Sequence, residues 1–190
     1  MHTLQIVLVD TSEVEDEKDM QAIVKATNWG LPEDSWSDWW EVGGRWQDYL
    51  TETVGKKIWP NQLENPVAIK LKEENLDVAK ELLKEVIKLQ AETVIELVDD
   101  LKKTNVDLNK YLLEFDNSID NWQIPYLIKS ILNMKEGTWN YNSRYFDSTQ
   151  WSSGTNPKAL LDYLEDPENN KDLWCGEINK YSLVVVDFHF

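Results

Sequence analysis

The residues best suited to binding chemistry lie in one short stretch, residues 36–46, which reads WSDWWEVGGRW. Four tryptophans within eleven residues offer flat aromatic surfaces, each with an N–H donor. Gly43 and Gly44 permit positive φ and a close approach of backbone or ligand. Arg45 follows them, so a guanidinium beside an aromatic ring suits an anion, a carboxylate or a stacked base. The alternative is that the rings are core and the glycine pair is a bulge or a turn.

A second aromatic stretch, residues 138–151, contains the other arginine of the chain. Arg144 precedes Tyr145, much as Arg45 precedes Trp46, whereas every other basic residue is a lysine. Stacking contributes roughly 1–3 kcal/mol per base, and an arginine fork makes a two-pronged contact with phosphate. We therefore predict a single aromatic ligand pocket built from both stretches. Its predicted residues are Trp39, Trp40, Arg45, Trp46, Trp139, Tyr141, Arg144 and Tyr145.

The two histidines stand at opposite ends of the chain. If the first and last strands pair as antiparallel neighbours, His2 comes to lie near His189 and Asp187. Such a group suggests either a metal or acid/base site or a purely structural contact. The sequence contains no HExxH, P-loop or nucleophile-elbow motif. We therefore expect no enzyme activity, no catalytic or metal-ligating residues and no cofactor.

Residues 38–46, DWWEVGGRW, resemble a W-D-W-Y-x-I-G-G-R-W signature found in small, largely uncharacterised proteins encoded by bacteriophages and other mobile elements. Those proteins often end in a strand that reads roughly V-D-C-H. Here the end reads Val186, Asp187, Phe188, His189, so the aspartate and the histidine match while phenylalanine replaces the cysteine. A role that needs a thiol at that position does not carry over. The resemblance implies a phage or mobile-element origin.

Length and composition limit the classes of protein to consider. The chain has 190 residues, of which 42% are hydrophobic, which predicts one domain over residues 1–190. Its 35 acidic and 19 basic residues give a net charge of −16, which disfavours direct nucleic-acid binding and leaves a basic partner possible. Cys175 is the single cysteine, so no internal disulfide can form. No apolar run approaches the ~18 residues needed to span a bilayer, and no signal peptide is evident, so we expect no membrane association and a location in the bacterial host cytoplasm.

The expected fold is α+β, with a mainly antiparallel sheet whose N- and C-terminal strands pair, and a helical layer. Apolar runs predict strands over residues 2–10 and 181–190, and a short strand over residues 38–42. Residues 45–50 suit either strand or helix. Spacing of 3.6 residues predicts one long helix over residues 75–103, with a possible break at Gln90 and Ala91. Further helices are expected after Thr11 and over residues 107–115, 121–135 and 156–164, and residues 138–151 are expected to form a strand or hairpin.

Two functional hypotheses follow. In the first, the chain is a phage-type, non-enzymatic anti-defence protein that sequesters a small nucleotide-like ligand in the aromatic pocket. In the second, it is an acidic protein that inhibits a host immune effector by occupying its nucleic-acid groove. We also expect a homo-oligomer, because the apolar positions of the long helix spread over an arc that one sheet is too narrow to cover.

Overall fold

The fold is mixed α/β and has one five-stranded sheet. The computed structural model describes residues 2–14, 39–54, 66–113, 122–136, 142–148, 155–174 and 176–189. The strands are β1 (His2–Asp10), β2 (Trp39–Val42), β3 (Ala68–Lys70), β4 (Tyr145–Asp147) and β5 (Tyr181–His189). The α-helices are α2 (Tyr49–Thr53), α3 (Leu76–Lys103), α4 (Leu108–Leu113), α5 (Gln123–Glu136) and α6 (Pro157–Glu165). Short 3₁₀ turns are η2 (Gly44–Trp46), η4 (Glu73–Asn75), η5 (Lys171–Leu173) and η6 (Ile178–Lys180).

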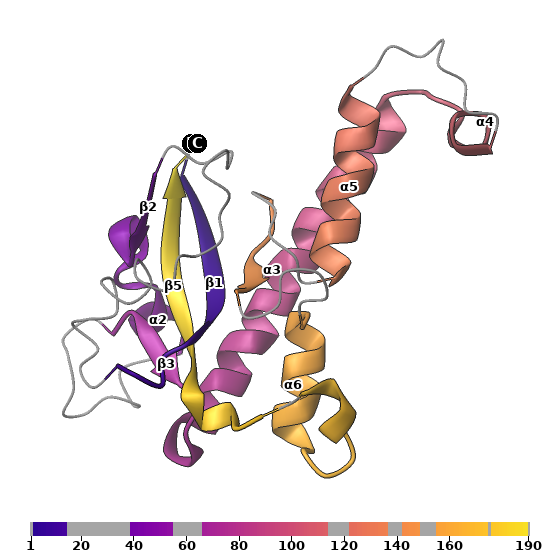
Figure 1. Cartoon of the computed structure of the whole chain (residues 1–190). Helices are drawn as coiled ribbons and strands as arrows, with labels where there is room; N and C mark the ends of the chain where they lie inside the picture. Colours follow the sequence, from indigo (N-terminus) through magenta and orange to yellow (C-terminus); the bar gives the residue numbers. More distant parts are fainter. Residues whose placement is uncertain are drawn as a thin grey trace.

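The two terminal strands form the centre of the sheet, as predicted. β1 and β5 pair antiparallel along their whole length, from His2 opposite His189 to Asp10 opposite Tyr181. β2 and β3 pair antiparallel with successive parts of the other edge of β5, and β4 pairs parallel with β1. Figure 1 shows both chain ends at the same end of the sheet. The sheet is therefore mainly antiparallel, and its order is β2-β5-β1-β4 with β3 beside β5.

Alternation along β1 and β5 gives the sheet two apolar faces. One face, here called the helical face, packs against α3 and α6. It includes Leu4, Ile6, Leu8, Leu183 and Val185. The opposite face has a smaller cluster. That cluster includes Val7, Val9, Val184, Val186 and Phe188. Because both faces are buried, β1 and β5 read as almost continuous apolar runs.

The long helix α3 joins the sheet to the other helices. In Figure 1, α6 lies along its lower half, while α5 lies along its upper half and extends away from the sheet. The predicted break at Gln90 and Ala91 is wrong, since α3 is continuous over 28 residues. Instead, the buried Gln90 side chain donates to the Met134 carbonyl at 2.7 Å and accepts the Arg144 N–H at 3.2 Å. This glutamine therefore ties α5 and the residue before β4 to the long helix.

Several smaller predictions can be compared with the structure. Residues 45–50, which the sequence left open between strand and helix, lie in η2, in the start of α2 and in the turn between them. The strand β3 was not predicted. The helix start at Asn156 is confirmed, because its Oδ1 accepts the Ala159 N–H at 2.8 Å and Pro157 begins α6. The helix expected after Thr11 lies outside the described residues beyond residue 14.

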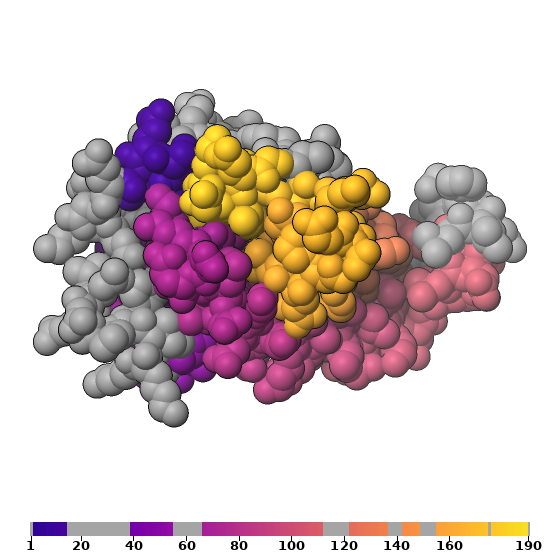
Figure 2. Space-filling model, turned by 90° about the horizontal axis from the view of Figure 1, so that it is seen from below, coloured from indigo at the N-terminus to yellow at the C-terminus, as the bar shows by residue number. Residues whose placement is uncertain are grey.

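The far end of the sheet closes against the start of the long helix. Figure 2, a view from below, shows the end of β1, the start of β5, the beginning of α3 and α6 gathered on one face. Thr11 supports this junction: its N–H donates to the Lys180 carbonyl at 2.8 Å, and its hydroxyl lies 2.6 Å from the Ser182 hydroxyl. The two chain ends that form the site described below are thus anchored at the opposite end of the sheet.

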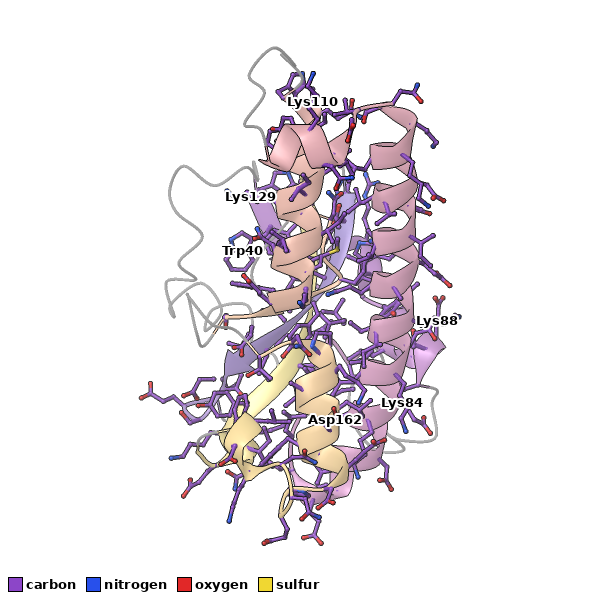
Figure 3. The ribbon with its side chains drawn as sticks, turned by 90° about the vertical axis from the view of Figure 1, so that its right-hand side faces the viewer. Trp40, Lys84, Lys88, Lys110, Lys129 and Asp162 are labelled. Carbon is purple, nitrogen blue, oxygen red and sulfur yellow. The ribbon has the colours of Figure 1, made fainter. Side chains whose placement is uncertain are left out.

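Charged side chains cover the outer surface of the helices. Lys84 and Lys88 project from α3 and Asp162 from α6, as Figure 3 shows. Lys84 pairs with Glu165 at 3.0 Å, which links α3 to α6 across their exposed sides. Among the described residues, no helix is long and apolar enough to cross a membrane.

Candidate functional site

The two stretches that carry the family resemblance lie side by side in the fold. β2 pairs antiparallel with the end of β5, so that Trp39 faces His189, Glu41 faces Asp187 and Val42 faces Val186. The glycine pair follows β2, and the Gly43 N–H donates to the Val185 carbonyl at 2.9 Å. Two segments about 140 residues apart therefore form one structural unit around Asp187.

Both glycines of the unit are required by its geometry. Gly43 has a φ of 75° and Gly44 has a φ of 51°, values that residues other than glycine rarely adopt. A Cβ on Gly44 would lie 2.6 Å from Asp187 Cβ and 2.8 Å from Asp187 Oδ2. The missing side chain therefore lets the backbone of η2 lie directly on the Asp187 side chain.

Asp187 is a buried carboxylate with a donor at each oxygen. Its side chain is 1% exposed. The Arg45 N–H donates to Oδ2 at 3.1 Å, and His2 Nδ1 lies 3.0 Å from Oδ1. A buried carboxylate needs such donors to offset its lost hydration. Asp187 thus joins the first strand, the last strand and the glycine turn.

Three aromatic rings, those of His2, Trp39 and His189, contact one another next to this carboxylate. The His2 ring meets His189 edge-on, with centroids 4.8 Å apart, and meets Trp39 edge-on at 5.5 Å. The Trp39 ring stacks on His189 at 5.3 Å with an interplanar angle of 10°. Trp39 remains 44% exposed. We call the six residues that meet here the Asp187 site: His2, Trp39, Gly44, Arg45, Asp187 and His189.

The structure divides the pocket that the sequence predicted. Trp39 and Arg45 belong to the Asp187 site, and Trp46 packs against the core of the helical face. Trp40 is on the opposite face, where it packs against the smaller cluster, because consecutive strand residues point to opposite sides. Tyr145 is fully buried, so its ring cannot stack with a ligand. Trp139 and Tyr141 lie outside the described residues.

The backbones of the two arginines lie next to opposite edge strands of the sheet. Arg45 follows β2, and Arg144 precedes β4, with β5 and β1 between them. Three strand spacings correspond to about 14 Å, so a single small anion cannot engage both backbone positions. The Arg144 N–H donates to Gln90 Oε1, and its carbonyl accepts from the Ile6 N–H at 2.9 Å. The backbone positions of the two arginines are therefore separate, and the sharing of one ligand by their side chains stays a prediction.

Arg144 still extends toward the helical face. Burial is the main cause that raises the pKa of Tyr49 in α2, and the charge of Glu85 raises it further, whereas the charge of Arg144 lowers it. The Arg144 charge is therefore close enough to act on a tyrosine three residues after Trp46. Within the ranges that the structure describes, its buried Nε has no hydrogen-bond acceptor.

Neither arginine forms an ion pair with a carboxylate in the described parts of the chain. The lysines differ, since several pair with acids three or four residues away, such as Lys102 with Asp99 at 2.9 Å.

The histidines and Asp187 were discussed from the sequence but were not included among the predicted site residues. The signal was available, because the antiparallel register of two nine-residue strands brings His2 opposite His189. No group of three or more His, Cys, Asp or Glu side chains in the described ranges is arranged to hold a metal ion. The Asp187 carboxylate bonds Nδ1 of His2 and so holds the His2 ring in one orientation.

Comparison with known proteins adds no relative. The chain matches no protein-family model, no curated protein and no solved structure.

Proposed function

We propose that the chain binds a small anionic, nucleotide-like ligand at the Asp187 site. The observation that carries this proposal is a buried carboxylate that bonds both the backbone N–H of the exposed Arg45 and the ring of His2, which the partly exposed Trp39 contacts. The arginine provides charge for a phosphate group, and the tryptophan ring provides a surface for a base. The network fixes the backbone of Arg45 and the ring of His2 before a ligand arrives, which lowers the entropic cost of binding.

The biological role that we propose is sequestration. The resemblance to phage and mobile-element proteins, together with the missing catalytic motifs, favours a phage-type, non-enzymatic anti-defence protein that removes a host nucleotide signal. A protein of this kind needs affinity and needs no turnover. Local charge at the Asp187 site then matters more than the net charge of −16.

Calorimetry tests the proposal directly. The panel contains 3′,5′-cyclic AMP, cyclic di-AMP, cyclic di-GMP, ADP-ribose and ATP, with adenosine and inorganic phosphate as the separate halves. We expect at least one nucleotide to bind and Arg45→Ala to weaken it by tenfold or more, since a charge-assisted contact contributes about 1.5–3 kcal/mol. Wild-type protein that binds no member of the panel would refute the proposal.

Two matched variants locate the ligand. Trp39→Phe and Trp40→Phe make the same chemical change in adjacent residues of β2, but Trp40 is on the opposite face. Trp39→Phe should weaken nucleotide binding severalfold, while Trp40→Phe should leave it unchanged. Arg144→Ala tests whether a larger ligand spans the helical face to the second arginine. Equal effects of the two tryptophan variants would place the ligand elsewhere.

A second candidate function is inhibition of a basic host effector. Glu81, Glu92 and Glu96 are exposed on one side of α3 and form no ion pair with a described residue, which gives a short acidic stripe. Lys84 and Lys88 project from the same helix and interrupt it. The test is capture of partners from a bacterial lysate at low and high salt, with the three glutamates changed to lysine as the control. Salt-sensitive capture that is lost in the control supports this candidate.

A further inference from the structure

The hydrogen bond to Asp187 decides which nitrogen of His2 carries a proton. An ionised carboxylate only accepts hydrogen bonds, and His2 Nδ1 lies 3.0 and 3.1 Å from its two oxygens. Nδ1 must therefore be the donor. The other ring nitrogen, Nε2, then has a free lone pair in the neutral ring and becomes a donor only after a second proton binds.

Nε2 is on the side of the ring that points away from the buried carboxylate. The His2 side chain is 16% exposed, and Trp39 and His189 flank its ring. The Arg45 backbone is anchored to the same carboxylate. Arg45 and Trp39 thus lie at the same corner of the sheet as His2, so the proposed anion would lie next to the His2 ring.

The charges around His2 make its protonation state decisive. Asp187 and His189 face it from β5, Glu41 lies opposite Asp187 on β2, and Arg45 comes from η2. Among the described residues that face His2, there are two carboxylates and one arginine, so these groups provide no surplus positive charge. A phosphate oxygen also cannot accept a hydrogen bond from the lone pair of a neutral Nε2.

We infer that His2 takes up a proton when a phosphate-bearing ligand binds, so that Nε2–H becomes a direct donor to the ligand's phosphate. Asp187 acts as a positioning residue, because it fixes the tautomer and offsets the new charge. The inference rests on the proposed function and adds a ligand-contacting residue, a preference for phosphate over neutral nucleosides, and a dependence on pH. Affinity for a phosphate-bearing ligand should therefore fall as pH rises.

The tautomer can be tested without any ligand. The chain contains two histidines, so ¹⁵N-histidine labelling gives two sets of ring signals, which His2→Gln and His189→Gln assign. We expect the neutral His2 ring to carry its proton on Nδ1. In Asp187→Asn, the amide oxygen can still accept the Arg45 N–H while the amide nitrogen donates to His2 Nδ1. That variant should move the proton to Nε2, and an unchanged tautomer would overturn the inference.

The proton uptake is tested by calorimetry with 3′,5′-cyclic AMP and cyclic di-AMP, whose phosphodiesters stay ionised across the range used. Titrations between about pH 6.5 and about pH 8.5, in buffers of different ionisation enthalpy, count the protons taken up. Wild type should take up close to one proton at the upper end. Both Asp187→Asn and His2→Gln should bind with little uptake and a flat pH profile, because each already presents an N–H donor.

The outcomes separate the two claims. If the nucleotides bind wild type without proton uptake, or if His2→Gln retains the full uptake, the inference about His2 is wrong while the proposed ligand class stands. If the proton is taken up but adenosine binds as well as 3′,5′-cyclic AMP, the phosphate contact is wrong. If neither the two phosphodiesters nor the wider panel binds, the proposed function fails, and the inference fails with it.

Discussion

Gly44→Ala is the substitution that most directly tests the geometry of the Asp187 site. The alanine Cβ would lie 2.6 Å from Asp187 Cβ, whereas ordinary contacts fall between 3.4 and 4 Å. A φ of 51° adds backbone strain of about 1–2 kcal/mol for a residue with a side chain. Forcing extra volume into a packed position costs about 1–3 kcal/mol more. We expect a total loss of about 2–5 kcal/mol, a large part of the stability of a typical domain.

Urea denaturation at equilibrium measures this loss, and two further variants divide it. Gly44→Asn introduces the same Cβ with a side chain that tolerates positive φ better, so its smaller loss reports mainly the collision. Gly176→Ala places alanine at φ of 120° where nothing lies within 4 Å, so it reports strain without collision. A loss below about 1 kcal/mol for Gly44→Ala, or His2 ring signals that do not change, would show that η2 does not rest on Asp187 as described.

Three further predictions concern the rest of the fold. Gln90→Leu should cost about 2–4 kcal/mol in urea denaturation, because it leaves the Met134 carbonyl and the Arg144 N–H without partners, whereas Gln90→Glu should lose only the bond to Met134. Tyr145→Phe should change stability by less than about 1 kcal/mol near neutral pH, since the buried hydroxyl has no hydrogen-bond partner among the described residues; a larger loss would reveal a partner. Burial, and after it the nearby Asp147 charge, hold the pKa of Tyr145 in the folded protein well above its usual value of 10.0. Above about pH 10 the tyrosine of the unfolded chain loses its proton while the folded one keeps it, so the stability of the wild type should fall as pH rises. Tyr145→Phe lacks this contribution and should lose about 1.4 kcal/mol less per pH unit. Light scattering at micromolar concentration should give a mass that is a multiple of the 22.3 kDa chain mass. Leu132→Glu should lower that mass, because Leu132 is 49% exposed on α5. A single-chain mass for the wild type would show that α5 already covers α3 sufficiently.

The sequence was informative where the signal is local or strictly periodic. The nine-residue strands β1 and β5 are apolar on both faces, and the apolar positions of α3 recur at helical spacing, so both elements follow from residue type. The cap at Asn156 is equally local. The meeting of His2 with Asp187 and His189 also followed from the sequence, once the terminal strands were taken as antiparallel neighbours.

The structure places some of the predicted pocket residues apart, for two physical reasons. The first was avoidable: Trp39 and Trp40 are consecutive in a strand, and period-two alternation already separates them onto opposite faces. The second was not. Whether Arg45 and Arg144 share an edge depends on strand order, and β4 has only three residues, too few to carry a pattern that would place it beside β1.

The position of the Asp187 site explains how a motif can depend on both ends of a chain. A buried carboxylate at the end of a central strand is stable only if donors reach it. Here one donor comes from the first strand through His2, and the other from the turn that Gly43 and Gly44 make possible. Removing either donor would leave Asp187 buried and undersatisfied, so the glycines, the arginine backbone and the histidine act as one unit. Because that unit also holds the exposed groups of Arg45 and Trp39 in place, the residues that stabilise this corner are the ones that prepare it to bind.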